Sequence, residues 1–571
     1  MRFRELMLIL ALPTSLRAQY VIGARDSLTA RVDAVFRAFD RVDSPGCAVG
    51  VYRDGRILYA RGYGMANLEL GVPNTPRTVF DIGSVSKQFA ATAILLLAQD
   101  GKLSLSDDIR KYFPELPAYA SGVTIRHLLN HTSGIRDFLT LMGLAGRSFE
   151  GVADTLDFLR VITRSAETNF PIGARYLYSN SGFALVGQLV YRLTGKPLPQ
   201  FLQQRVLGPL GMNDSRSLSD HAGIIPNRAQ GYAPRADGFA IASSQFDGTG
   251  GAGSMHATVE DFARWDRNWE EPVVGGRALV DSLQVRGKLT NDSTISYALG
   301  VSVDSWRGLH TVSHGGSWAG YRAHFVRFPE HRLSVTTFCN LSTSGPDTLA
   351  IKVATVYLGA RMSPDTIGSW DSALVSALPV PMTLEQLRGF EGAWRNVELG
   401  EVRRTRIRGD SLMAGAGGAL TRLVPLDGGT GGMPARLSIR TRGGTTRHQR
   451  FGLETLSAAQ LAEYPGDYLS EEIETTNTFV ADSGRLVITS ANSADSNSWQ
   501  GYGQARLHDG FPGGDVQNQL PDGVRTGEHF RRRLLRGDAR QHFLNRRAMP
   551  RLAVECPAQL IRNSVEFSHR A

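Results

Sequence analysis

Cysteine is scarce in this sequence of 571 residues, and its scarcity excludes several kinds of site. The three cysteines, Cys47, Cys339 and Cys556, are widely spaced and odd in number. This spacing offers neither a disulfide framework nor the ligand set of a metal site, so we expect buried free thiols, no metal and no other cofactor. The sequence also lacks the Gly-x-Ser-x-Gly elbow of α/β-hydrolases, the His-Glu-x-x-His zinc motif and a Walker loop.

Lysine is equally scarce, since only six of the 63 basic residues are lysines, although the net charge is +9. From Arg525 onward eleven arginines stand against four acidic residues, so most of the excess lies in the last part of the chain. The rest carries no basic stripe with interleaved aromatic residues, which argues against nucleic acid as a partner.

No apolar run reaches the ~20 residues that a membrane-spanning helix needs, so we expect no transmembrane segment. A shorter apolar run at 6–13 follows a basic start and precedes Ala18. This arrangement is typical of a secretory signal peptide, here residues 1–18, and predicts a periplasmic or secreted protein. A frayed N-terminal helix is the alternative.

Residues 21–361 have the pattern of one α/β (α+β) domain. Apolar residues recur at helical spacing in 27–42 and 84–99, and turn chemistry at 53–55 joins two strands into a hairpin. Strand candidates lie near both ends of the segment with helices between them, which predicts an antiparallel sheet assembled from both ends and flanked by helices. The expected strands are 47–52, 57–63, 310–314, 321–328 and 333–339, and the further helices are 125–130, 182–193, 258–269 and 348–358.

The remainder of the chain has a different organisation. Residues 362–381 lose all pattern, which is typical of a linker. The pattern Leu-x-x-Phe-x-Gly-x-Trp at 387–394 then recurs as Leu-x-x-Tyr-x-Gly-x-Tyr at 461–468, and each copy precedes short alternating segments. We predict a β-rich region over 382–491 with two barrel-like antiparallel units; a chance match of four positions is the alternative. Residues 492–571 form a basic tail to which we assign no fold.

The sharpest chemical signal is the segment Asp-Ile-Gly-Ser-Val-Ser-Lys at 81–87, where the helix expected at 84–99 opens. Residues three apart on a helix share one face, so the amine of Lys87 can exchange a proton with the hydroxyl of Ser84. Serine needs such a neighbouring base to become a nucleophile. The unpaired N–H groups of the helix N-terminus favour a developing anion. An N-capping serine beside a solvated lysine is the alternative.

Two further motifs carry candidate site residues. Tyr-Ser-Asn at 178–180 precedes an expected helix, where Tyr178 can point into a cleft. A positive neighbour lowers the pKa of a phenol, so Tyr178 beside Lys87 can act as base and then as acid. His-Gly-Gly-Ser at 314–317 ends a strand, and its glycines allow a substrate to approach the strand edge. Routine turns are the alternatives for both motifs.

The three motifs together occur in the order and spacing of one family. Over about residues 27–358 the sequence resembles the serine β-lactamase/penicillin-binding-protein superfamily, nearest to its class C and D-aminopeptidase/esterase branch. Supporting stretches are Thr-Ile-Arg-His-Leu-Leu-Asn-His-Thr-Ser-Gly at 124–134, Pro-Leu-Gly-Met at 209–212 and Gly-Gly-Ala-Gly-Ser-Met at 250–255. The C-terminal β units resemble barrels that accompany some D-aminopeptidases of that family.

The resemblance implies a role for each matching position. Ser84 would be acylated, Lys87 and Tyr178 would shuttle its proton, and Asn180 would hold the carbonyl of a substrate amide or ester. At the strand edge, the N–H of Ser317 would complete an oxyanion hole with the N–H of Ser84.

His314, two residues before Gly316, departs from the pattern of the β-lactamases in this branch. They carry a lysine at this place that helps recognise the carboxylate of the drug. A largely neutral imidazole attracts a carboxylate less than an ammonium does, which disfavours efficient β-lactam hydrolysis. In the resembling family, histidine at this place often accompanies esterase or peptidase activity.

We therefore expect a serine hydrolase that forms an acyl-enzyme and cleaves an ester, a peptide or amide that can contain a D-amino acid, or, less readily, a β-lactam. Its partner would be a small-molecule or peptide substrate, with peptidoglycan fragments among the candidates; the sequence does not indicate an oligomeric state. A non-catalytic or slowly acylating peptidoglycan-binding sensor, and a structural envelope protein with a decayed enzyme domain, stay open as alternatives. The intact motifs favour the enzyme.

Overall fold

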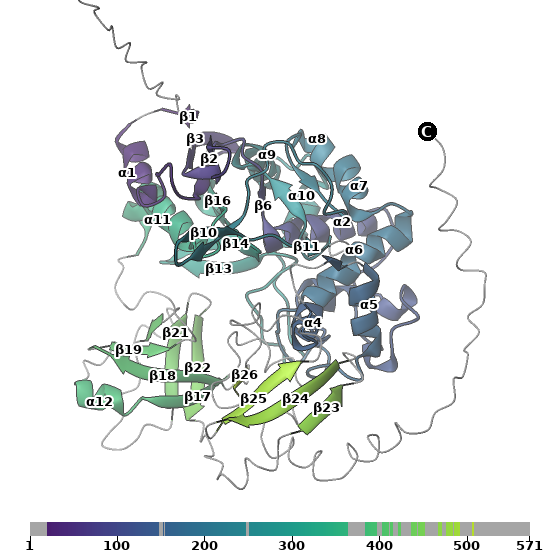
Figure 1. Ribbon diagram of the computed structural model, residues 1–571. Helices are drawn as coiled ribbons and strands as arrows, with labels where there is room; N and C mark the ends of the chain where they lie inside the picture. Colours follow the sequence, from purple (N-terminus) through teal and green to yellow (C-terminus); the bar gives the residue numbers. More distant parts are fainter. Residues whose placement is uncertain are drawn as a thin grey trace, which may run out of the picture. The chain divides into compact units, whose positions relative to one another are not determined.

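A computed structural model describes residues 20–24, 26–147, 152–153, 155–246, 250–363 and 383–396, together with strands and a few adjoining residues between 402 and 506 (Figure 1). The expected signal peptide, nearly all of the expected linker and most of the basic tail lie outside the described residues. Among the helices of the described part, none is long and apolar enough to cross a membrane.

A seven-stranded antiparallel sheet forms the centre of the N-terminal part of the chain, with the strand order β1-β3-β2-β16-β15-β14-β13. Its first three strands come from the start of the chain and the other four from beyond residue 300, so the expectation of a sheet assembled from both ends is confirmed. The strands are β1 (Val21–Gly23), β2 (Cys47–Arg53), β3 (Arg56–Tyr63), β13 (Ser302–Trp306), β14 (Leu309–Trp318), β15 (Tyr321–Phe328) and β16 (Leu333–Cys339).

The central strands β2 and β16 are buried on both faces, which explains their nearly continuous apolar sequences. Alternate residues point to opposite faces. Val49, Val51 and Val335 pack with α1 (Ser27–Phe36) and α11 (Pro346–Leu358) on one face. Ala48 and Phe338 belong to the larger core on the other face, which α9 (Val259–Glu270) covers.

The helical part of the domain is built around α2 (Lys87–Gln99), in which every residue from Lys87 to Leu97 is buried. A helix that is buried all round belongs to the core of a domain, and α2 packs against several other helices of the segment between β3 and β13. The helices that it contacts most are α6 (Asn180–Thr194), α7 (Leu198–Leu202) and α10 (Gly276–Leu283). The segment also contains α3 (Ile125–Leu129), α4 (Phe138–Leu144), α5 (Thr155–Arg164) and α8 (Gly208–Leu210). Short strands in the same segment are β4 (Met65–Asn67), β5 (Val72–Pro73), β6 (Phe80–Asp81), β7 (Val152–Ala153), β8 (Arg216–Ser217), β9 (Tyr232–Arg235), β10 (Gly238–Ile241), β11 (Gln245–Phe246) and β12 (Met255–Ala257).

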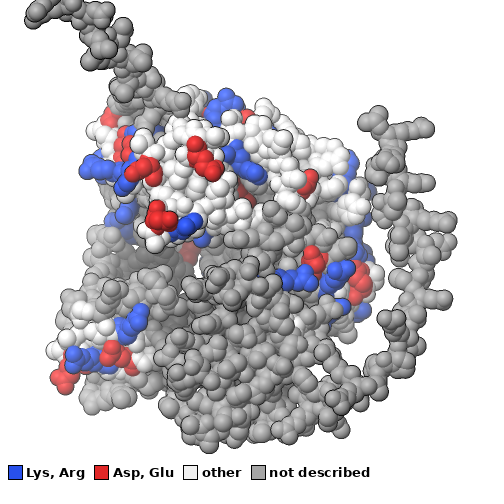
Figure 2. Space-filling view, in the orientation of Figure 1, with Lys and Arg blue, Asp and Glu red and all other residues white. Residues whose placement is uncertain are grey.

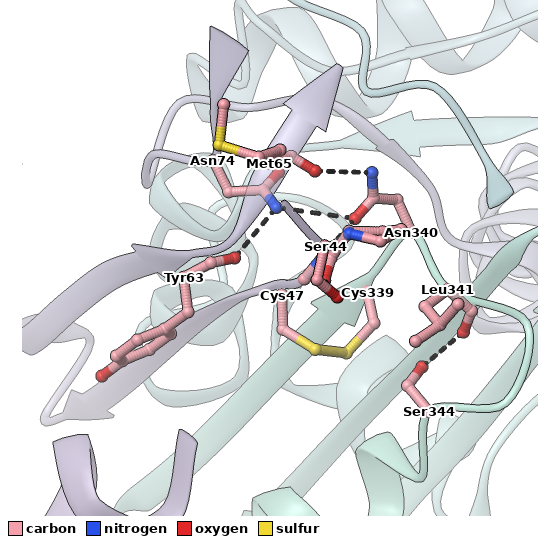
Figure 3. The surroundings of a disulfide bond; sticks show 11 residues. Ser44, Cys47, Tyr63, Met65, Asn74, Cys339, Asn340, Leu341 and Ser344 are labelled. Atoms are coloured by element: carbon pink, nitrogen blue, oxygen red, sulfur yellow. Dashed lines mark hydrogen bonds between the residues drawn. A yellow bond between two sulfur atoms is a disulfide. The ribbon is translucent and has the colours of Figure 1, made fainter. Parts of the chain in front are cut away.

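The expectation of free thiols at Cys47 and Cys339 is wrong, because the two residues form a disulfide (Figure 3). They face each other in the register of β2 and β16, although 292 positions separate them in sequence. Asn340, which follows β16, forms hydrogen bonds near the same strand ends. Its Oδ1 accepts from the N–H of Gly46 at 2.9 Å, and its Nδ2 donates to the carbonyl of Met65 at 3.0 Å. Cys556 lies outside the described residues. The burial of both paired cysteines was expected; their pairing depends on strand register.

Charged side chains of both signs are interspersed on the face of the molecule drawn in Figure 2. Several arginines of the N-terminal part form ion pairs, including Arg61 with Asp33 and Asp40, and Arg332 with Asp54. The Arg332–Asp54 pair is exposed, and such pairs contribute little stability, about 0–1 kcal/mol each.

Two antiparallel sheets form the described part of the C-terminal region, and both begin at the repeated sequence pattern. Gly392 opens β17 of the first sheet and Gly466 opens β23 of the second. Trp394 is buried beside Phe390 and Leu412 in a small core, and its Nε1 donates to the carbonyl of Phe390 at 2.9 Å. In the second copy of the pattern, residues 461 and 464 take the places of Leu387 and Phe390. Both lie outside the described residues. Over the strands that are described, neither sheet closes into a barrel.

The first sheet has the order β20-β19-β18-β17-β22-β21 and the second β23-β24-β25-β26. The elements are α12 (Leu384–Arg388), β17 (Gly392–Asn396), β18 (Val402–Arg408), β19 (Ser411–Ala414), β20 (Thr421–Leu423), β21 (Arg436–Thr441), β22 (Gly444–Arg450), β23 (Gly466–Ser470), β24 (Thr475–Asp482), β25 (Arg485–Ser490) and β26 (Ala505–Arg506).

Candidate active site

The segment that carries Ser84 differs from the expected α-helix in its first turn. Residues Gly83–Ser86 form a 3₁₀ turn, and α2 begins only at Lys87. In a 3₁₀ turn the side chains at i and i+3 eclipse each other, which places Lys87 Nζ 3.0 Å from Ser84 Oγ. Ser84 is also the one partly exposed residue between Thr78 and Leu97, so its hydroxyl is accessible within a segment that is otherwise buried.

Two polar side chains hold this turn in place. The Oδ1 atom of Asp81 accepts from the N–H of Gly83 at 2.7 Å, which fixes the turn where Gly83 adopts a φ of +49°. The hydroxyl of Ser86 donates to the carbonyl of Gly83 at 2.5 Å and accepts from the N–H of Met255, the first residue of β12, at 3.2 Å. The turn that carries Ser84 is thereby attached to β12.

Lys87 is fully buried, and three acceptors surround its amine. Besides Ser84 Oγ, its Nζ donates to Asn180 Oδ1 at 2.9 Å and to the carbonyl of Ala252 at 2.8 Å. Burial lowers the pKa of Lys87 to about 7, and the carboxylate of Asp137 opposes this shift. Far more of the amine is therefore neutral near pH 7 than in an exposed lysine, and the neutral amine can accept the proton of Ser84.

The structure brings Tyr178 from almost a hundred positions downstream to the side of Lys87. The centroid of its ring lies 4.8 Å from Lys87 Nζ. Two residues later Asn180 begins α6, and its N–H donates to Asp137 Oδ2 at 2.5 Å. Because the Oδ1 of Asn180 faces Lys87, its Nδ2 is the atom suited to donate to a substrate carbonyl.

The edge of β14 approaches the Ser84 turn so closely that there is no room for a side chain at Gly83 or at Gly316. A Cβ atom on Gly316 would lie 2.0 Å from the carbonyl oxygen of Ile82 and 3.2 Å from the N of Ser84. A Cβ atom on Gly83 would lie 2.7 Å from the N of Ser317. The N–H groups of Ser84 and Ser317 thus belong to two backbones in contact, which is the arrangement that a two-donor oxyanion hole requires.

His314 is buried on β14 and is bound to Tyr297. Its Nδ1 lies 2.6 Å from the carbonyl oxygen of Gly315, which can only accept, so Nδ1 carries the proton. Its Nε2 then accepts from the hydroxyl of Tyr297 at 2.8 Å. Burial, together with the charge of Lys87, lowers the pKa of His314 to about 3. The imidazole is therefore neutral at physiological pH.

We expect the His314→Lys variant to gain selectivity for substrates that carry a carboxylate, because an ammonium would stand where the neutral imidazole is. The measurement is the ratio of kcat/KM for matched substrates with and without the carboxylate. His310→Ala, at a partly exposed position near the start of β14, is the control. An unchanged ratio in His314→Lys would remove this position from substrate selection.

Sequence reasoning missed several residues of the site. Ala252 lies in the Gly-Gly-Ala-Gly-Ser-Met stretch at 250–255, but that stretch does not reveal that its carbonyl binds Lys87. Tyr297 carries no motif that reveals its contact with His314. Asp137 follows the Ser-Gly pair at 133–134 and caps α4, but its bond to Asn180 depends on tertiary packing. His131 lies in the supporting stretch at 124–134 and received no role there, although its ring lies 4.2 Å from that of Tyr178. Within the described residues, no group of three or more His, Cys, Asp or Glu side chains could hold a metal ion.

The fold and this arrangement define an enzyme of the serine hydrolase class. The family described as Beta-lactamase matches residues 32–357, and the chain belongs to this family. The D-aminopeptidase of Gluconobacter oxydans is 29% identical over 351 residues, which are 61% of this chain and 66% of that protein. The D-aminopeptidase of Brucella anthropi is 25% identical over 452 residues, 77% of this chain and 82% of that protein.

A solved structure has the same fold. The octameric penicillin-binding protein homologue from Pyrococcus abyssi superposes with a TM-score of 0.52 at 21% identity, over 81% of this chain and 97% of that one. At this identity the likeness concerns the fold alone.

Proposed function

We propose that this hydrolase forms an acyl-enzyme on Ser84 and cleaves the amide or ester bond of a small substrate, with peptides and amides of D-amino acids as the favoured class. The observation that carries the proposal is the buried amine of Lys87, which lies 3.0 Å from Ser84 Oγ and has a pKa of about 7. A neutral amine at hydrogen-bond distance is what a serine needs to become a nucleophile near neutral pH.

The proposed reaction has two halves. Ser84 Oγ attacks the substrate carbonyl while its proton passes to the amine of Lys87, and the N–H groups of Ser84 and Ser317 bind the oxyanion. Tyr178, beside Lys87, gives a proton to the leaving amine or alkoxide and regains one from Lys87. Water then attacks the ester on Ser84, and the same groups return the proton to Oγ as the acid product leaves.

The preference for amides and esters over β-lactams has two supports. His314 is neutral and bound to Tyr297, so it offers no cation to the carboxylate of a β-lactam drug. The two relatives described above carry the name D-aminopeptidase.

We also propose that the protein is exported to the periplasm or beyond the cell. The N-terminal signal pattern supports this, and so does the Cys47–Cys339 disulfide, because disulfides persist in oxidising compartments. The mature N-terminus of protein recovered from a periplasmic fraction tests it; an intact residue 1 on cytoplasmic protein alone would contradict it.

A panel of chromogenic substrates tests the substrate class: D-alanine and L-alanine p-nitroanilides, p-nitrophenyl butyrate and nitrocefin. We expect turnover of the D-anilide and the ester to exceed that of nitrocefin, and the D-anilide to react faster than the L-anilide. Acid quenching followed by intact-mass measurement should show a protein heavier by one acyl group. Turnover of nitrocefin alone would contradict the substrate class, and an adduct that persists without turnover would identify a slowly acylating binding protein.

A further inference from the structure

His131 is a buried residue with two locally unfavourable features, and the proposed chemistry does not account for either. Its φ of +59° lies in the left-handed region that residues other than glycine rarely adopt. Its Nε2 is buried without a hydrogen-bond partner among the described residues. Both features cost stability, and such costs persist where the surroundings impose the conformation, which is often at functional sites.

The hydrogen bonds of His131 bracket Tyr178. Its carbonyl oxygen accepts from the N–H of Leu177 at 3.0 Å, and its Nδ1 accepts from the N–H of Ser179 at 3.2 Å. The backbone is thus held on either side of Tyr178. Because Nδ1 is the acceptor, it carries no proton, and the ring is neutral with its hydrogen on Nε2. Burial and the charge of Lys87 keep the pKa of His131 well below its usual range, in agreement with this.

The imidazole ring also supports the phenol ring directly. The centroids of His131 and Tyr178 are 4.2 Å apart, with an angle of 36° between the planes. Tyr297 packs against the same imidazole at 4.6 Å and 61°. The His131 side chain thereby contacts both Tyr178, the proposed proton carrier, and Tyr297, which binds His314.

We propose that His131 is a positioning residue that fixes the phenol of Tyr178 beside Lys87. The inference rests on the proposed role of Tyr178 in acyl transfer. A displacement of about 1 Å in a reacting group can cost roughly 10²-fold in rate. His131→Ala keeps the carbonyl that accepts from Leu177, but it removes the Nδ1 acceptor of the Ser179 N–H and the ring contact with Tyr178. Loss of these two contacts would allow a displacement of this size.

A double-mutant cycle tests the proposal through p-nitrophenyl butyrate hydrolysis by the full chain. We expect His131→Ala to lower kcat by about 10–100-fold with little change in KM. In a Tyr178→Phe background the same substitution should have almost no further effect, because the group that His131 positions is already gone. His131→Asn should recover part of the loss, since asparagine tolerates a positive φ and offers a side-chain acceptor.

His127→Ala is the matched control. The Nδ1 of His127 also accepts from a backbone N–H, that of Thr124 at 3.1 Å, in the same segment. We expect this variant to keep wild-type kcat. If His131→Ala does not fold, His131→Asn alone in the two backgrounds completes the cycle.

Equal losses of kcat in the wild-type and Tyr178→Phe backgrounds would overturn the proposal and leave His131 a structural residue, as would an effect on KM alone. Wild-type turnover by Ser84→Ala would overturn the proposed function instead, whatever His131 does. Wild-type turnover by Tyr178→Phe, with Ser84→Ala inactive, would remove both the role of Tyr178 and that of His131 but keep the acyl-enzyme.

Discussion

The Ser84→Ala variant is expected to lose covalent labelling by a fluorophosphonate and to lower kcat for ester and D-anilide substrates by roughly 10⁴–10⁶-fold. The hydroxyl oxygen of Ser84 is the atom that would be acylated, and removing it leaves only the binding and oxyanion contributions of the site. The measurement is intact mass after labelling, together with turnover of the same substrates.

A measurement of thermal stability should distinguish this loss of activity from misfolding of the variant. Ser84 is partly exposed, and the amine of Lys87 keeps two other acceptors when the hydroxyl is absent. We expect the midpoint of thermal unfolding of Ser84→Ala to stay close to that of the wild type. Ser121→Ala, at an exposed position in a turn, serves as the control that keeps both labelling and turnover. Equal labelling of Ser84→Ala and the wild type would remove Ser84 from its proposed role.

The Lys87→Met variant is expected to lose about 10²–10⁴-fold in kcat, because the proposed general base is replaced by an apolar chain of similar length. In the wild type, kcat/KM should rise with pH up to about 7, where the amine becomes neutral, and fall tenfold per pH unit below it. In Lys87→Met this limb of the profile should vanish from the residual activity. Persistence of the same limb in the variant would assign it to another group.

The same substitution should also change how the free energy of unfolding depends on pH. The folded pKa of Lys87, about 7, is lower than the 10.5 that is usual for a lysine amine. Between these values the unfolded chain binds more protons than the folded one, so the free energy of unfolding rises with pH there, by up to about 1.4 kcal/mol per pH unit. Lys87→Met should lack this increment between pH 7.5 and 9.5. Lys111→Met, at an exposed lysine, is the control. Identical pH dependence in Lys87→Met and the wild type would contradict the buried, depressed amine.

Those features that depend on short stretches of sequence were predictable. The apolar pattern located five strands and six helices of the N-terminal part, although the first helix ends at Phe36, well before the expected residue 42. It did not predict β1, β13 or several of the shorter helices. The three-residue spacing of Ser84 and Lys87 implied their contact, because any helical turn brings such residues together. The meeting of Tyr178 with this pair could not be derived from spacing, and came from the resemblance to a family.

Features that depend on register or on backbone atoms were not predictable. The pairing of Cys47 with Cys339 follows from which residues face each other across β2 and β16. The carbonyl of Ala252 reaches Lys87 through the path of a glycine-rich segment, and any residue type supplies a carbonyl. The role of His131 was missed because a lone histidine has no periodic partner in sequence. Its contacts come from residues more than forty positions away.

The disulfide also determines what a protease can do to this enzyme. Every residue of the candidate site, from Ser84 to Ser317, lies between Cys47 and Cys339, inside the covalent ring that the bond closes. A single cut in an exposed loop of that ring would open the backbone without releasing a fragment, since both pieces would stay joined through sulfur. The nicked enzyme would run as one band on a denaturing gel and separate into two only after reduction. Such a molecule can survive a proteolytic cut as a single particle, with Ser84, Lys87 and Tyr178 still covalently joined to one another.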